Sequence, residues 1–410
     1  MFSQRIQASL KKRYRKERMF KFWGLFSISV ALLFLVILFS SIIYRGVPGF
    51  VSHQIALEID LTEDKKVNYR KVIKNSLKEE LLEEFPDSRT SDLSRLVNKN
   101  AHFDLRDMLK KNPQLKGSKS IIWFVTSSDV DMFLKGKILE STKSDNRQID
   151  DQQIARIKFL QSENLIRAGF NWNFFKNADS SEPEVAGMAA SIRGSIFTVL
   201  IFLLASFPVA VMAAFYLEEF APKNTMTDIV EVSINNLAAI PSIIFGLLGL
   251  VVYLNFMHLP RSSSIVGGLT LSMLVLPVII IATRNAIKTI PSSIKEAAVA
   301  MGASKVQVMF HHTLPLSLPG IMTGTILAIS RALGETAPLL MIGMVAFIAD
   351  IPEGFSDPTT VMPVQIYLWS DSPELGFAEK SAAAIMVLLA FLISFNGVAV
   401  YIRNKFENKW

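Results

Sequence analysis

Residues 290–304 read IPSSIKEAAVAMGAS and lie between two long apolar stretches. Pro291 fixes a turn, and the serines that follow it can cap the start of a helix. Gly302 can end that helix with a positive φ. We therefore expect a short helix, a turn and a second helical stretch before Leu314–Pro315. A short helix with small side chains on one face suits docking into a groove of another protein. A helix lying at the membrane surface without a partner is the alternative.

Long apolar stretches make up much of the remaining sequence. Hydrophobic residues are 50% of the 410, and the mean hydropathy is +0.34, a positive average that soluble domains rarely reach. A run of roughly 20 apolar residues can cross the hydrocarbon core as a helix, because a helix satisfies its own backbone hydrogen bonds in lipid. We predict an all-α polytopic membrane protein with six spanning helices, at residues 22–44, 193–217, 229–256, 264–287, 318–349 and 380–402.

The first 21 residues are basic, with Glu17 as their single acid. A basic cluster directly before an apolar span usually marks its cytoplasmic end, and it can contact anionic lipid headgroups. A nucleic-acid partner is disfavoured because no recognition fold follows. The span 22–44 is long for a cleaved signal peptide and no small-residue cleavage site follows it, so we predict a retained anchor.

The charges of the short loops agree with this orientation. The loop 288–317 carries Lys288, Lys295 and Lys305, whereas the loop 350–379 is acidic. Lysine and arginine are enriched in cytoplasmic loops, so six spans place both termini in the cytoplasm. The predicted organisation is a basic cytoplasmic segment 1–21, a first span 22–44, an extracytoplasmic domain 45–190, a membrane core 191–403 containing the loop 288–317, and a cytoplasmic tail 404–410.

The hydrophilic block 45–190 is large enough for a small domain. Apolar residues have helical spacing at 68–85, 92–112 and 152–168, and the β-branched segment 120–125 reads as a strand. An α+β domain is therefore expected. The aromatic residues at 171–175 fit either a membrane interface or the core of this domain.

Two charges interrupt the fifth predicted span. Arg331 and Glu335 are four residues apart, on one helical face, with long apolar stretches on both sides. A charge at this depth costs about 2.5 kcal/mol or more, so it faces protein or a wet path. Gly334 and Pro338 are expected to loosen the helix, and broken helices near the midplane commonly form transport sites. Arginine offers a planar fork of donors for an anion. A purely structural salt bridge is the alternative.

The loop resembles the EAA motif of ABC importer permeases of the MetI-like type. The matching residues are Glu296, Ala297, Ala298, Gly302, Leu314 and Pro315, with His312 in place of the usual isoleucine. The resemblance implies that these residues contact a separate ATPase subunit. No G-x-x-x-x-G-K-[ST] phosphate-binding loop occurs in the sequence, so ATP and magnesium are expected to be used by that partner and not by this chain.

Two further segments resemble the PstA family of phosphate permeases. Residues 334–339 read GETAPL, and residues 235–250 read NNLAAIPSIIFGLLGL. Together with the two charges in the fifth span, we predict a substrate path with Arg331, Glu335 and Thr336. Residues expected to serve helix packing or gating are Asn235, Asn236, Pro241, Gly334 and Pro338. The block 45–190 is similar to the insert of a long form of this family and has no activity that we can assign.

The same resemblance implies the partners and location. These are phosphate, membrane lipid, a second permease of the PstC kind, an ATPase dimer of the PstB kind and a periplasmic phosphate-binding protein of the PstS kind, in the bacterial inner membrane. A permease for sulfate or molybdate, or a membrane-anchored sensor using residues 45–190, are the alternatives.

Other chemistry is not indicated. The chain has no cysteine and only five histidines, and the pair His311–His312 favours partner contact or solvent over a metal. No catalytic, cofactor or metal site is predicted. Arg284 is interpreted as an anchor for its helix end at the lipid headgroups, with a role in substrate exit as the alternative.

Overall fold

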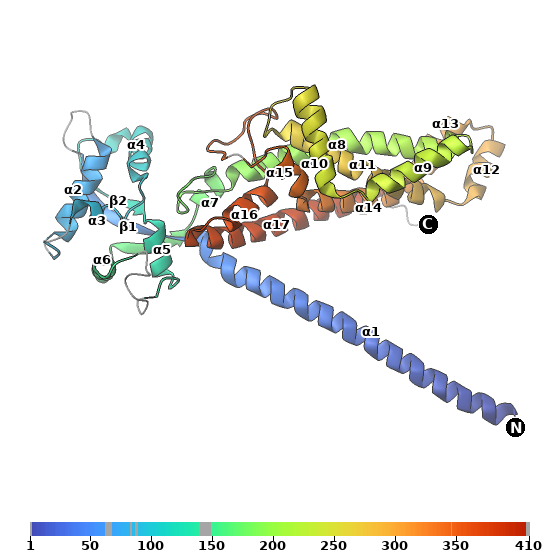
Figure 1. Cartoon of the computed structure of the whole chain (residues 1–410), viewed down its shortest axis with the longest axis horizontal. Helices are drawn as coiled ribbons and strands as arrows, with labels where there is room; N and C mark the ends of the chain where they lie inside the picture. Colours follow the sequence, from blue (N-terminus) through green and yellow to red (C-terminus); the bar gives the residue numbers. More distant parts are fainter. Residues whose placement is uncertain are drawn as a thin grey trace.

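The computed structural model describes residues 2–61, 68–82, 84–86, 89–139, 149–345 and 347–406. It consists of a small α+β domain at one end of an elongated helical bundle, with the N-terminal helix α1 running away from the bundle (Figure 1). We refer to the two ends of the bundle as the domain end, which carries the α+β domain, and the α12 end, which carries helix α12 (Ser292–Ala300).

The described residues contain five helices long and apolar enough to cross a membrane, or six if the bent pair α9–α10 is one span. The predicted polytopic α-helical class is therefore confirmed. The helices of the bundle are α8 (Ala189–Phe215), α9 (Thr225–Ala238), α10 (Ser242–Gly249), α11 (Ser264–Lys288), α14 (Leu314–Gly334) and α17 (Leu375–Phe406). π-helical turns follow three helical segments, at Tyr216–Phe220, Leu250–Phe256 and Met309–Thr313. Shorter helices are α7 (Asn173–Lys176), α13 (Lys305–Val308), α15 (Ala337–Met341) and α16 (Met362–Ser370).

One predicted span is wrong at its end. The stretch 318–349 is not a continuous helix, because α14 stops at Gly334 and the next residue, Glu335, is extended with ψ 114°. The apolar residues that follow form the short helix α15 and then a turn at Gly343. The prediction rested on the length of the apolar stretch. That length is the same for one continuous helix and for two shorter helices separated by a break.

Helix α11 is the centre of the bundle. It packs along α8 and α14, and small residues allow the close approach. A side chain at Gly268 would overlap Ile201 of α8, and side chains at Gly320 and Gly324 would overlap Ala286 and Ala282 of α11. Such small-residue contacts hold membrane helices together, because lipid provides no hydrophobic drive for their association.

Helix α1 (Phe2–Gly46) touches the bundle only near its C-terminal end. A side chain at Gly46 would meet Ala382 and Met386 of α17. The apolar part of α1 is otherwise uncovered within the described residues. The position of Gly46 fixes the point at which α1 reaches the domain end, directly before the α+β domain begins (Figure 1).

The α+β domain contains a three-stranded antiparallel sheet in the order β2-β1-β3. The strands are β1 (Val51–Asp60), β2 (Lys119–Val125) and β3 (Ile166–Phe170). Alternate residues of β1 and β2, such as Leu57 and Phe124, face a core shared with the helices. The helices are α2 (Tyr69–Leu81), α3 (Thr90–Leu93), α4 (Ala101–Lys111), α5 (Ser128–Leu134) and α6 (Asp151–Ser162).

The local predictions in this domain have mixed outcomes. The strand at 120–125 and the helix within 68–85 are confirmed. The helix predicted at 92–112 is two helices, α3 and α4, with a non-helical link between them. The helix predicted at 152–168 ends at Ser162, and its last residues belong to β3. The aromatic residues at 171–175 do not share one environment. Phe174 is buried against Trp369, whereas Trp172 is exposed.

Buried polar contacts join the α+β domain to the bundle. The ammonium group of Lys135, directly after α5, lies 2.7 Å from Asp131 and 2.5 Å from Glu379 of α17. Lys380 donates a hydrogen bond to the carbonyl oxygen of Ala186. Because these groups are buried, loss of one partner would leave a buried charge unpaired, which is strongly destabilising.

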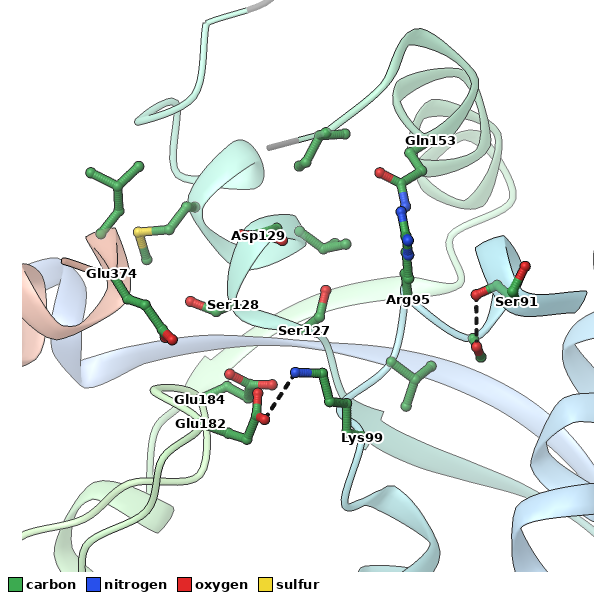
Figure 2. A pocket seen from close by; sticks show the side chains of 16 residues that line it. Ser91, Arg95, Lys99, Ser127, Ser128, Asp129, Gln153, Glu182, Glu184 and Glu374 are labelled. Atoms are coloured by element: carbon green, nitrogen blue, oxygen red, sulfur yellow. Dashed lines mark hydrogen bonds and ion pairs between the residues drawn. The ribbon is translucent and has the colours of Figure 1, made fainter. Parts of the chain in front are cut away.

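A cavity of about 560 Å³ opens beside this junction. Figure 2 shows Lys99 paired with Glu182 across it, with Glu184 next to them. Glu184 is buried, and one of its carboxylate oxygens accepts a hydrogen bond from Asn98 at 2.7 Å. Its other oxygen has no hydrogen-bond partner among the described residues. Burial raises the pKa of Glu184 to about 7, since desolvation disfavours the carboxylate.

We predict that Glu184 makes stability depend on pH. Its folded pKa is raised, so the folded chain holds the proton more tightly, and the free energy of unfolding falls as pH rises from about 4.5 to 7. The loss amounts to at most about 3 kcal/mol. Glu184→Gln should melt at a higher temperature than the wild type at pH 8 and at a similar temperature at pH 4.5. A melting temperature displaced equally at all pH values would contradict this.

Candidate functional site

The end of helix α14 carries a charged pair. The Nε atom of Arg331 lies 3.8 Å from Oε1 of Glu335, so the predicted pairing is present as a long contact. The Arg331 side chain is 43% exposed and that of Glu335 is 25% exposed. The rest of α14 near this point is buried, at Ala328 and Ala332. Arg331 thus lies on the face of α14 that this chain does not cover, one turn after the exposed Leu327.

The contacts between α14 and α11 give the depth of Arg331. Gly320 lies against Ala286 and Gly324 against Ala282. The two helices are therefore antiparallel, and each step of four residues along α14 corresponds to four residues back along α11. Continued at 1.5 Å per residue, this register places Arg331 level with about Val275. Val275 is close to the middle of α11. The break after Gly334 is therefore deep in the bundle and not at its end.

A second break lies in the pair α9–α10, which bends by 101° between Ala238 and Ser242. Pro241 lies at this bend and precedes α10 with φ −55° and ψ 135°. A side chain at Gly246 would come within 2.6 Å of the Cα atom of Pro338. The helix that follows one break thus packs directly on the helix that follows the other.

The polar residues of α9 lie on an uncovered face. Asn235 and Asn236 are exposed, and no residue of α9 is buried by the rest of the described chain. Large apolar side chains such as Met226 and Ile229 are exposed on the same helix. Thr336 begins α15 and is half-buried beside Glu335. The two breaks and the uncovered helix form one candidate site.

The loop at the α12 end has the predicted geometry. Helix α12 is followed by Gly302 at φ +89°. The amide of Gly302 donates to the carbonyl of Val299, and that of Ala303 donates to the carbonyl of Ala298. This pair of hydrogen bonds is a Schellman C-cap, which favours glycine at the left-handed position.

Helix α12 presents its surface outward. No α12 residue is buried, and Glu296 and Ala297 are exposed while Ala298 is half-buried. Met301 is 89% exposed. Leu314 and Pro315 are the first two residues of α14, and Leu314 packs on the apolar cluster around Phe215 and Ile287. A small, exposed and apolar helix surface of this kind is an apt docking site for another protein.

The sequence from residue 186 to 408 matches the family described as binding-protein-dependent transport system inner membrane component. The chain belongs to this family. The permease is thus a multi-pass membrane transport component and not an enzyme. Residues 7–144 match a domain of unknown function, DUF3333. This match assigns no role to the α+β domain.

Relatives of the permease carry related descriptions. It is 28% identical to the phosphate transport system permease protein PstA of Haemophilus influenzae over 58% of this chain and 82% of that protein. It is 30% identical to PstA of Yersinia pestis over 52% of this chain and 71% of that protein. It is 32% identical to the probable ABC transporter permease protein YqgI of Bacillus subtilis, over 42% of this chain and only 58% of that protein's length.

Solved structures with a similar fold include the inward-facing MetNI methionine ABC transporter. The match covers 54% of the permease and 98% of that chain, at 19% identity and a TM-score of 0.42. These values add nothing to the family assignment.

Sequence reasoning missed an ion-pair cluster at the α12 end of the permease. The interpretation of Arg284 as a lipid anchor is wrong, because its guanidinium is largely buried and held by two carboxylates. Its Nε atom lies 2.5 Å from Glu218 and its Nη2 atom 2.7 Å from Glu231. Buried cations are paired in this way because desolvation is otherwise too costly. The adjacent acidic pair Glu218–Glu219 at the end of an apolar helix was the available signal.

We predict that Gly246 is required for the two helices to meet. Gly246→Ala places a Cβ atom 2.6 Å from Pro338, and forced overlap of this kind costs about 1–3 kcal/mol. Gly397→Ala is the matched control, since nothing lies within 4 Å of a Cβ atom there. The melting temperature of the purified protein should fall for the first variant and stay level or rise for the second. Equal effects would contradict the packing described.

Proposed function

We propose that this chain is a transmembrane permease subunit of an ATP-driven phosphate importer. It would form the substrate path and be driven by a separate ATPase. The family assignment supplies the transport role, and the phosphate transport relatives supply the substrate class. The observation that carries the site is the position of Arg331, which is 43% exposed near the middle of a span. Such a group does not face hydrocarbon, so a second subunit or a wet path covers it.

Arg331, Glu335 and Thr336 would line the path. Arginine presents a fork of donors that fits two oxygens of a phosphate, while Glu335, 3.8 Å away, balances the charge between transport events. The break after Gly334 and that at Pro241 leave short helices α15 and α10 which can shift against α14 and α9. Asn235 and Asn236 would face the partner permease.

The loop at the α12 end would receive the ATPase. Glu296, Ala297, Ala298 and Gly302 form the exposed helix and its cap, and Leu314 with Pro315 joins it to α14. This role requires the α12 end, with both chain termini, to lie in the cytoplasm of a bacterial inner membrane. The α+β domain and the loop around α16 would then lie outside, where a phosphate-binding protein of the PstS kind delivers its ligand. The second permease and the ATPase would be of the PstC and PstB kinds.

We predict that Arg331→Gln lowers uptake of labelled phosphate about tenfold or more, because a charge-assisted hydrogen bond contributes about 1.5–3 kcal/mol. Arg331→Lys should retain part of the activity, since it keeps the charge but loses the fork. Arg193→Gln, at the exposed start of α8, is the control for loss of an arginine. Unchanged uptake by Arg331→Gln in an assembled transporter would exclude the anion contact. Uptake of labelled sulfate or molybdate that unlabelled phosphate does not inhibit would reassign the substrate.

The docking role of the loop is tested at Gly302. Gly302→Val strains a left-handed position and should disrupt the helix cap, so the ATPase should no longer co-purify. Gly117→Val is the matched control, because Gly117 has nearly the same φ of +87° and open space around it but lies in the α+β domain. Retention of the ATPase by the Gly302 variant would contradict the proposed docking.

A further inference from the structure

The π-helical turn after α8 is the meeting point of four helices. Residues Tyr216–Phe220 continue α8 with five-residue backbone spacing, and they carry Glu218 and Glu219. Consecutive residues on a helix point in directions about 100° apart. The two carboxylates therefore point to different neighbours, and both are mostly buried, at 14% and 19% exposure.

Glu219 reaches the loop at the α12 end. Its Oε1 atom lies 2.5 Å from Nζ of Lys295 in α12. Helix α12 has no buried residue, and its contacts are mainly with the segment that follows it, α13 and Met309–Thr313. Among the described residues, this is the ion pair that connects α12 to the helices of the bundle.

Glu218 reaches the opposite way. It accepts from Arg284 at 2.5 Å, and Nζ of Lys288 lies 3.4 Å away. The same Arg284 side chain holds Glu231 of α9 at 2.7 Å. One guanidinium thus ties the end of α8 and the middle of α9 to α11.

The connected helices lead to the candidate site. Glu231 lies seven residues before Ala238, where α9 ends in the 101° bend. Beneath the ion pairs, Phe215 and Ile287 pack with Met309 and Leu314. A displacement of α12 can therefore reach the break by a polar route through Glu219 and by an apolar route through Leu314.

We propose that Lys295 and Glu219 form the strut that transmits movement of α12 to α8, while Glu218, Arg284 and Glu231 make α8, α11 and α9 move together. These are positioning residues, since none of them lies at the breaks. The proposal rests on the proposed function, because it takes α12 as the element that a motor moves. Single π-helical turns inside helices are frequent at functional positions.

The test is a charge exchange in the complete transporter, reconstituted in proteoliposomes with its ATPase, second permease and binding protein. Labelled phosphate uptake and ATP hydrolysis are measured together. Glu219→Lys and Lys295→Glu should each lower the phosphate transported per ATP hydrolysed by about tenfold, a size typical of coupling between sites. The double exchange should restore most of that ratio, because the pair is re-formed with its signs reversed. Lys223→Glu, an exposed lysine between α8 and α9 and outside the docking loop, is the matched control and should keep the wild-type ratio.

The outcomes separate this inference from the proposed function. If the wild-type complex does not couple phosphate uptake to ATP hydrolysis, the proposed function fails. If it does, and the single variants keep its ratio or the double exchange is no better than the singles, the strut is wrong. A loss of ATPase co-purification confined to Lys295→Glu would assign Lys295 to docking and also overturn the proposal. If the charge reversals prevent folding, Glu219→Gln replaces them, because it removes the charge without reversing it. It should likewise lower the phosphate transported per ATP hydrolysed, and an unchanged ratio would overturn the proposal.

Discussion

A guanidinium near the middle of a membrane span has to be kept away from hydrocarbon, and this constraint organises the structure. Arg331 sits on the face of α14 that this chain leaves open, level with about the middle of α11. The helix stops three residues later, and the Glu335 carboxylate lies 3.8 Å from the guanidinium. The open face, the charge and the break occur together. In the proposed function, this open face is where a second subunit or a wet path completes the site.

Small residues make this arrangement compatible with tight packing. Gly320 and Gly324 bring α14 against α11, and Gly246 brings α10 against Pro338. The two short helices beyond the breaks are held to each other while the longer helices are held to α11. Both short helices also pack on α11, where a side chain at Gly249 of α10 would meet Thr270, so α10 and α15 share one packed core with the longer helices.

Much of this was readable from the sequence, and the failures have physical reasons. The positive φ at Gly302 and the bend at Pro241 follow from local backbone rules, so both could be predicted. The end of α14 could not, because Leu339 and the residues after it are as apolar as a helix interior. The role of Arg284 depends on Glu218, 66 residues away, and no local rule brings these two together. Strand β1 was overlooked although Ile55, Leu57 and Ile59 alternate with charged Glu58 and Asp60 in the manner of a half-buried strand.

The most direct test of the central claim uses the absence of cysteine from the chain. A single cysteine is introduced by Thr336→Cys at the start of α15, next to Glu335, and by Leu33→Cys in the exposed apolar part of α1 as the lipid-facing control. Reactivity with a charged thiol reagent is measured in the assembled transporter, with and without phosphate and ATP. The account predicts that the first position reacts during turnover and is protected by phosphate, while the second does not react. Equal inertness of both positions in an active transporter would contradict a wet path past Arg331.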